Sequence, residues 1–170
     1  MVPPLSIEFL LREYLINTIG KRTLLSSRAL GNIGEAIARL ELRRRNYRII
    51  TNNFNTAAGE IDIIASDGKD LVFIEVKTRT SYEFGSPSES IDNHKTRRIR
   101  KVAGFYLVRE RPVEEYRDCR FDIITVMIKK DILNCVMGAI TPDKVTQKDI
   151  TGIADAIIDS CTIEHIEAAF

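Results

Sequence analysis

Residues Gly59–Arg79 read GEIDIIASDGKDLVFIEVKTR, and this stretch decides the fold. Two short apolar segments, Ile61–Ala65 and Leu71–Val76, flank a polar turn that contains the pair Asp67-Gly68. An Asp-Gly pair is typical of a tight hairpin, because glycine adopts the positive φ that such turns require. The stretch therefore predicts an antiparallel β-hairpin.

Charged residues gather at the open end of this hairpin. If the strands pair symmetrically about the turn, Asp62 lies opposite Glu75, and Glu60 lies opposite Lys77. Because side chains alternate along a strand, all four are expected on one face. Opposed residues have Cβ atoms about 4.5–5.5 Å apart, so the two carboxylates could share one cation and would repel each other without it. The remaining inward positions are apolar on both faces, which predicts helices on both sides of the hairpin.

The charged pattern resembles that of a known nuclease superfamily. Asp62, followed by Glu75-Val76-Lys77 at the end of the next strand, is similar to the acidic-x-lysine core of restriction-endonuclease-like nucleases, including archaeal Holliday junction resolvases. More narrowly, several blocks resemble the small bacterial YraN-like family, and they run in order from about residue 31 to residue 170. They are GNIGEAIA (31–38), GEIDIIA (59–65), LVFIEVKTR (71–79), FGSPSESID (84–92), RFDIITV (120–126) and IEHIEAAF (163–170).

The resemblance implies a fold and an activity. The fold is an α/β, restriction-endonuclease-like αβββαβ core, with a mixed central sheet flanked by helices, an extra N-terminal helix and a C-terminal insertion. The activity is divalent-metal-dependent hydrolysis of phosphodiester bonds in DNA, with branched or junction DNA as one expected substrate. Asp62 and Glu75 would hold Mg²⁺ or Mn²⁺, which prefer hard oxygen ligands. Lys77 would act on the attacking water or the phosphate, and the nearby carboxylates, which favour its charged form, point to an electrostatic role.

Glu35 is a further candidate catalytic residue on an expected helix over residues 29–45. Apolar residues recur there at helical spacing, and Asn46 suits its end. The resembling nucleases carry an acidic residue on their first helix, which implies that Glu35 approaches the metal site and could bind a second ion. The alternative is a surface ion pair with Arg39, one helical turn away.

A second long helix is expected to begin at the capping box SPSE, residues 86–89, and to end at Pro112. Lys95 falls on its apolar stripe and needs an anion, which could be a site carboxylate, a substrate phosphate or a structural salt-bridge partner. The densest basic region of the chain lies around this helix and forms the candidate nucleic-acid-binding set. Its members are Arg79, Lys95, Arg97, Arg98 and Lys101.

The remaining strands are expected at Tyr47–Thr51, followed by an asparagine-rich turn, at Cys119–Met127, parallel to its neighbour, and at Thr162–Ile166. Asp122 and His165 lie within the last two, and we expect both to make structural hydrogen bonds.

The chain of 170 residues suits one main domain, residues 28–170, with an N-terminal helix and linker over 1–27 and an insertion over about 132–161. With a net charge of only +1, any affinity for nucleic acid must come from local clusters of basic residues. Three widely spaced cysteines indicate free, buried thiols and no zinc site. We expect a cytoplasmic protein that does not enter a membrane, with DNA as its partner and a homodimer as one possible assembly.

Two other classes of function stay open. A nucleic-acid-binding protein could keep the nuclease fold without cutting, and would then bind with a steep salt dependence. An interaction protein could use the same charges only to neutralise one another, Glu60 with Lys77 and Glu75 with Lys95.

Overall fold

The computed structural model describes residues 26–80, 93–110, 116–131, 133 and 156–170 of the chain. Its principal elements are two long helices and five strands. They are α2 (Ser27–Arg44), β1 (Arg48–Thr56), β2 (Gly59–Ser66), β3 (Leu71–Arg79), α3 (Asn93–Glu110), β4 (Cys119–Met127) and β5 (Thr162–Ile166). Residues 130, 131 and 133 and residues 156–160 are also helical.

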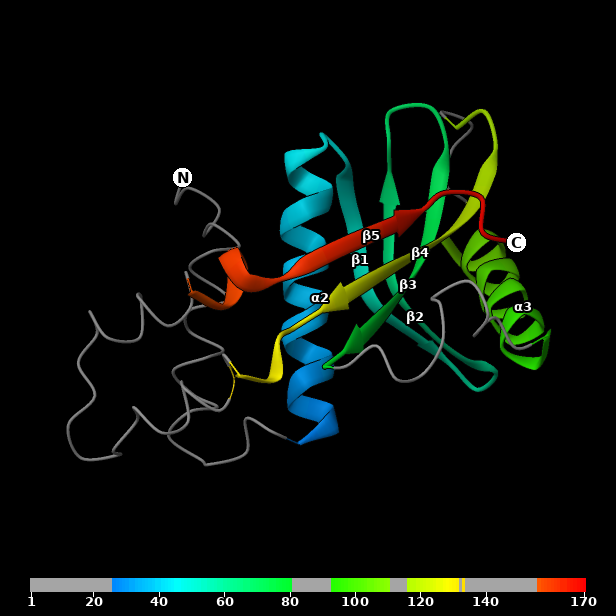
Figure 1. Ribbon diagram of the computed structural model, residues 1–170. Coiled ribbons are helices and arrows are strands. Elements are labelled where there is room, and N and C mark those ends of the chain that lie inside the picture. The colour runs from blue at the N-terminus through cyan, green and yellow to red at the C-terminus, as the bar shows by residue number, and fades with distance from the viewer. Residues whose placement is uncertain (1–25, 81–92, 111–115, 132, 134–155) are drawn as a thin grey trace, which may run out of the picture.

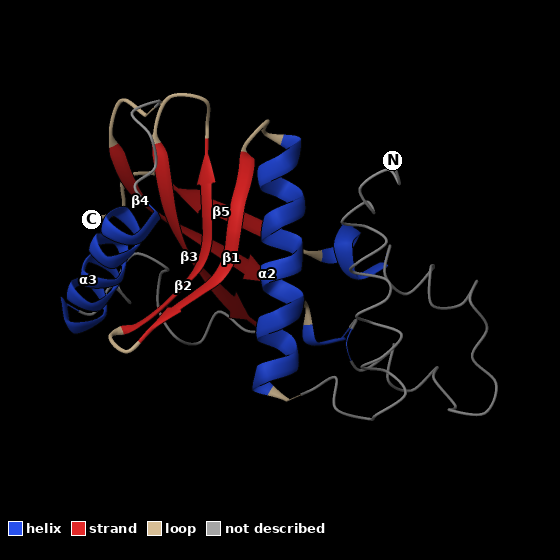
Figure 2. Cartoon of the chain, turned by 180° about the vertical axis from the view of Figure 1, so that it is seen from behind, coloured by secondary structure: helices blue, strands red, loops and turns tan. Residues whose placement is uncertain are grey.

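The strands form one mixed sheet in the order β1-β2-β3-β4-β5, in which β3 and β4 are parallel and the other neighbours are antiparallel (Figure 1). Helix α2 packs on one face through Ile33, Ile37 and Leu42. Helix α3 packs on the other through Ile99, Val102 and Tyr106 (Figure 2). The expected α/β class, with a mixed sheet flanked by helices, is confirmed, and the arrangement is compatible with a restriction-endonuclease-like core.

The central hairpin has the expected register. Ile63 pairs with Ile74, Ile64 with Phe73, Ala65 with Val72 and Ser66 with Leu71. The turn closes as the Asp-Gly pair predicts, with Gly68 at φ 92° and the Asp67 carboxylate accepting the backbone N–H of Lys69 at 2.9 Å. Buried apolar residues on both faces confirm that helices cover the hairpin on both sides.

Helix α2 begins two residues earlier than the apolar pattern predicts. The Ser26 hydroxyl accepts the backbone N–H of Ala29 at 3.1 Å and caps the helix, satisfying one of the donors left unpaired at a helix start. Asn46, with a positive φ of 63°, follows the end of the helix as expected.

The prediction of an asparagine-rich turn directly after residue 51 is wrong. Residues 52–55 continue β1 and pair with β2 as far as Thr56↔Gly59. The strand tolerates the irregular sequence because a register shift between Ile49 and Thr51 and a positive φ of 51° at Asn53 accommodate it. The actual turn lies at residues 56–59, where Gly59 has φ 139°.

Strands β4 and β5 have the expected bounds, and β4 is parallel to β3 as expected. The N-terminal helix, the capping box at 86–89, Pro112 and most of the insertion lie outside the described residues. Cys119 is exposed, so its expected burial is wrong, because it lies at the very start of β4. Across the described residues, neither long helix is apolar over enough of its length to cross a bilayer.

Candidate active site

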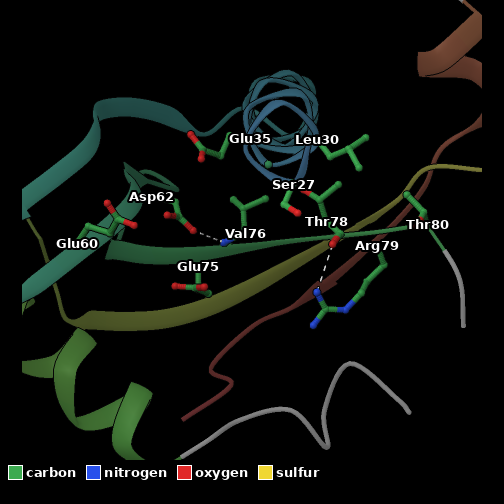
Figure 3. Close-up of a pocket in the computed structure, with 11 residues that line it drawn as sticks. Ser27, Leu30, Glu35, Glu60, Asp62, Glu75, Val76, Thr78, Arg79 and Thr80 are labelled. Carbon is green, nitrogen blue, oxygen red and sulfur yellow. Dashed lines mark hydrogen bonds between the residues drawn. The ribbon is translucent and has the colours of Figure 1, made fainter. Parts of the chain in front are cut away.

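The candidate site lies where β2 and β3 separate. Their backbone pairing runs from the turn to Ile63↔Ile74, and Asp62 and Glu75 are the next residues on each strand. There the side chain of Asp62 takes over from the backbone ladder, because its Oδ2 accepts the backbone N–H of Val76 at 2.7 Å (Figure 3). The separation turns the end of a regular hairpin into a place that side chains can line.

The carboxylates reach this place from two sides of β3 and not from one face, as the sequence suggested. Figure 3 shows Val76 and Glu35 on the α2 side of the β3 ribbon and Glu75 on the other side. Asp62 lies beside the strand, between them. On the far side, the Lys95 ammonium on α3 forms an ion pair with the Glu75 carboxylate.

Two cavities meet at these carboxylates. The larger, about 650 Å³, lies towards α2 and includes Glu35 and Arg79 in its lining. The smaller, about 270 Å³, lies towards α3 and includes Lys95 and Arg98. Glu60, Asp62 and Glu75 line both cavities. A polyanionic ligand could therefore approach the acidic groups between basic side chains of helix α3 and strand β3.

Negative charge at the site is under-compensated. Burial, followed by repulsion from Glu75, raises the pKa of Asp62 to about 7, although the hydrogen bond from Val76 N–H acts in the opposite direction. Burial also raises the pKa of Glu35, and the nearby Arg39 offsets part of this shift. A positive charge entering between these groups would relieve both effects.

Lys77 also has a perturbed pKa, and its direction contradicts the sequence-based expectation. Burial, together with repulsion from Lys95, lowers the pKa of Lys77 by more than Glu75 raises it. The charged form is therefore less favoured than in a solvated lysine, which brings this amine closer to accepting a proton from water.

Close packing of α2 on β3 places Glu35 near the site. A Cβ built on Gly34 would lie 1.9 Å from the Thr78 Oγ1, so only glycine lets the helix approach β3 this closely. Glu35 lies 3.7 Å from Arg39, which agrees with the expected ion pair, and it also lines the larger cavity. Our sequence-based reasoning missed Gly34, although GNIGEA placed a glycine directly before the candidate acid.

The donor set suits a hard divalent cation but is not a complete cage. Asp62 and Glu75 offer carboxylate oxygens, and the Val76 main-chain carbonyl directly follows Glu75 in sequence. No three His, Cys, Asp or Glu side chains form a ready-made metal cluster in the part of the chain that the structure describes. Mg²⁺ is usually bound by one or two carboxylates, with water and substrate phosphate as its other ligands, so two carboxylates fit this cation.

The candidate nucleic-acid-binding residues do not all reach the site. Arg79 lines the larger cavity and Lys95 and Arg98 line the smaller one. Arg97 is exposed on α3 and Lys101 lies further along that helix, outside both linings.

A second acidic group lies elsewhere on the sheet. The carboxylate of Asp122 accepts hydrogen bonds from Arg120 at 2.9 Å and from the backbone N–H of Ala168 at 3.0 Å. It also lies 2.8 Å from the His165 Nε2. The expectation that Asp122 makes structural hydrogen bonds agrees with these contacts. His165 meets it only in part, since its Nδ1 is buried and has no hydrogen-bond partner among the described residues.

Comparison with known proteins finds one family whose members resemble the segments that carry the candidate site. The model of "Uncharacterised protein family UPF0102" matches residues 34–126. A UPF0102 protein of Moorella thermoacetica is 42% identical over 106 residues, which are 62% of this chain and 87% of the relative. One from Caldanaerobacter subterraneus is 37% identical over 131 residues, covering 77% of this chain and 96% of the relative. The matched region runs from α2 to β4 and so contains all four candidate catalytic residues.

Proposed function

Because this chain belongs to the UPF0102 family, whose name assigns no activity, we propose its function from the site itself. We propose a divalent-metal-dependent endonuclease that hydrolyses phosphodiester bonds in DNA. The observation that carries the proposal is the pair Asp62 and Glu75 at the point where β2 and β3 separate, where burial and repulsion from Glu75 raise the pKa of Asp62. Lys77 lies two residues beyond Glu75 on β3. The fold and the resemblance to restriction-endonuclease-like nucleases support the same interpretation.

The chain's own residues would share the work as follows. Asp62 and Glu75 would hold Mg²⁺ or Mn²⁺, which, when bound, supplies positive charge against the phosphate and activates the attacking water. The hydrogen bond from Val76 N–H fixes one oxygen of Asp62, so the carboxylate is oriented before a ligand arrives. Glu35, across the larger cavity, would orient water or help to bind a second ion.

Lys77 would hold the attacking water and either stabilise the phosphate or accept a proton. Its lowered pKa makes the second role more accessible than the sequence suggested. Lys95 contacts Glu75 and therefore limits the repulsion between the acidic groups when no cation is bound. Arg79 and Arg98, at opposite cavities, would hold the phosphates on either side of the scissile bond.

The decisive experiment measures cleavage of linear duplex, single-stranded and four-way-junction DNA with Mg²⁺ or Mn²⁺. We expect Asp62→Asn and Glu75→Gln each to lower the cleavage rate at least about a hundredfold, because each removes a carboxylate that would hold the cation, and the cation supplies the positive charge at the phosphate. Matched controls are Asp159→Asn and Glu164→Gln, which make the same chemical changes at exposed positions outside the cavities at the site. If the site variants cleave as fast as the controls, the proposal is wrong.

The ion pair between Lys95 and Glu75 favours one alternative, a nucleic-acid-binding protein that does not cut. In that case the wild type binds DNA with strong salt dependence, and neither cation produces turnover. A separate experiment adds Mn²⁺ to the protein without DNA and tests whether the carboxylates hold a metal or only form an internal ion-pair network. A metal site raises the midpoint of thermal unfolding of the wild type and not that of Asp62→Asn, whereas a purely internal ion-pair network responds in neither protein.

A further inference from the structure

A third cavity lies between the β1–β2 turn and helix α3. It has a volume of about 610 Å³ and is lined by residues 54–58, at the end of β1 and in the turn, and by Lys101, Phe105, Val108 and Arg109 of α3. This volume is in the range of about 300–1,000 Å³ that is typical of small-ligand pockets. We call this cavity the turn groove. None of the candidate catalytic residues lines it.

The turn groove combines exposed apolar surface with positive charge. Phe105 and Val108 are 48% and 75% exposed, and they are the large hydrophobic side chains that the described surface leaves most open. The Arg109 guanidinium lies 4.4 Å from the centre of the Phe54 ring and holds a cation on the groove wall. Lys101 adds a second cation. Glu110 pairs with Arg109 at 2.7 Å, but no carboxylate belongs to the lining of the groove itself. An anionic ligand with a flat apolar part complements such a surface.

The turn groove continues from the candidate active site. Arg98 lines the smaller cavity at the carboxylates, and its guanidinium lies against Gly59, where an added Cβ would be 3.2 Å from Nη2. The next turn residue, Ala58, already lines the turn groove. Arg98, Lys101, Phe105 and Val108 recur at intervals of three or four along α3 and so share one face of the helix.

The length of this path suits a few nucleotides. Lys95 and Phe105 are ten residues apart on α3, which corresponds to about 15 Å at a rise of about 1.5 Å per residue. A stacked strand advances about 3.4 Å per nucleotide, so the path spans at most about four nucleotides. A strand whose phosphate lay at the carboxylates could therefore place a nearby base in the turn groove.

We propose that the turn groove binds an unpaired nucleobase of the substrate strand, with Phe105 as the stacking surface and Lys101 and Arg109 at the flanking phosphates. The inference rests on the proposed function and makes it more specific, since it requires a substrate with unpaired nucleotides close to the cut. In a duplex the bases are stacked on each other, whereas an unpaired base offers its face to an aromatic ring. The positive lining favours a nucleic-acid strand over an apolar peptide as the occupant.

The chain contains no tryptophan, so Phe105→Trp creates a single fluorescent reporter in the turn groove. The probe is an oligodeoxythymidylate added in EDTA, which prevents cleavage, and a parallel series uses oligouridylate to compare RNA. We expect saturable quenching of the tryptophan emission by the single strand. A blunt duplex, or an abasic oligonucleotide of the same length and charge, should quench little. Equal quenching by the abasic strand would overturn the proposal, because it would show contact with backbone and not with a base.

The matched control is Thr162→Trp, which places the same reporter at an exposed position on β5, at the opposite edge of the sheet from β1. Its emission should not change with the oligonucleotide. If the two variants are quenched alike, the effect is not specific to the turn groove and the proposal is wrong.

Phe105→Ala tests how much stacking on the Phe105 ring contributes to the affinity for single-stranded DNA. Stacking of one base on an aromatic side chain corresponds to roughly a fivefold to hundredfold change in affinity, so the variant should bind the single strand at least about fivefold more weakly and bind duplex unchanged. Unchanged single-strand affinity overturns the proposal. A change only in sedimentation, from dimer to monomer, would instead assign the groove to self-association and also overturn it.

Failure of this inference is distinguishable from failure of the proposed function. If Asp62→Asn abolishes cleavage while Phe105→Ala leaves single-strand binding unchanged, the proposed nuclease function is supported and the proposed base-binding site is wrong. If Phe105→Ala weakens binding but no cation produces cleavage, the base-binding site is supported and the protein binds nucleic acid without cutting it.

Discussion

Two groups of carboxylates lie on the same sheet, and their chemical environments are opposite. Asp122 is fully buried, yet hydrogen bonds from His165 and Arg120 lower its pKa against the effect of burial. Asp62 is only partly buried, yet burial and repulsion from Glu75 raise its pKa to about 7. The more deeply buried acid is therefore the better compensated one.

The hydrogen-bond partners of the two groups account for this difference. Arg120 bridges Asp122 to the Asp67 carboxylate at 2.9 Å and to the Tyr47 hydroxyl at 2.8 Å, so this group ties β4 to the β2–β3 turn and to the end of α2. Asp62 and Glu75 instead line two cavities, and burial together with their mutual repulsion raises the pKa of Asp62. A buried charge that the fold pairs stabilises the fold, whereas one that it leaves under-paired is available to an external ion.

The largest expected effect tests the structural group. We expect Asp122→Asn to lower the free energy of unfolding by about 3 kcal/mol, because removing one member of a buried ionic network leaves Arg120 and His165 without their main partner. Urea titration followed by circular dichroism measures the loss. Asp159→Asn, at an exposed position, should remain within about 0.5 kcal/mol of the wild type. An unchanged Asp122→Asn would remove the basis of the comparison.

The second effect concerns the packing of α2 on β3 that brings Glu35 near Asp62 and Glu75. Gly34→Ala should lower the free energy of unfolding by about 2 kcal/mol, since the new methyl group would collide with the Thr78 side chain. The cleavage rate should fall as well, because α2 must move away from β3 and take Glu35 with it. Gly31→Ala on the same helix is the matched control. An added Cβ there meets nothing within 4 Å, so this variant should keep or gain stability through the higher helix propensity of alanine.

Much of the fold followed from local patterns in the sequence. The Asp67-Gly68 turn and the flanking apolar segments specified a hairpin whose register the structure confirms, and Cys119–Met127 and Thr162–Ile166 have the predicted bounds. These elements were predictable because alternation and turn chemistry act over a few residues. The continuation of β1 through residues 52–55 was not, because their pairing with β2 overrides a sequence that favours a turn.

The candidate site was predictable in its residues but not in its geometry. Asp62, Glu75 and Lys77 could be selected from the hairpin pattern, yet the placement of the carboxylates on two sides of β3 depends on where the ladder ends. The lowered pKa of Lys77 depends on burial and on Lys95, which comes from another element. The turn groove was not foreseen, because it forms only when the β1–β2 turn meets α3.

A smaller effect tests the Asp62 site. Here the expected change in the free energy of unfolding has the opposite sign to that of Asp122→Asn. With EDTA at pH 8, we expect Asp62→Asn to raise the free energy of unfolding by about 1 kcal/mol, because it removes an unfavourable negative charge next to Glu75. This value is well below the full equivalent of the pKa shift, since Asp62 is partly exposed and solvent screens its charge. The asparagine carbonyl oxygen can still accept the Val76 N–H. If Asp62→Asn instead destabilised the protein, Asp62 would be a stabilising charge like Asp122, and the contrast between the two sites would be wrong.

The smallest effect is a pH dependence that isolates the structural group. The folded-state pKa of Asp122 is below its ordinary value, so its stabilising contribution is complete above about pH 4, the ordinary range of an aspartate in the unfolded chain. It is lost as the pH falls through the lower folded-state value. The measurement compares Asp62→Asn with the double variant Asp62→Asn/Asp122→Asn, so that the Asp62 carboxyl contributes to neither curve. We expect the difference in unfolding free energy between them not to shrink from pH 7 to pH 5 and to shrink by about 1 kcal/mol per pH unit below pH 4. A difference that instead shrank between pH 7 and pH 5 would mean that Asp122 has a raised pKa and is no better compensated than Asp62.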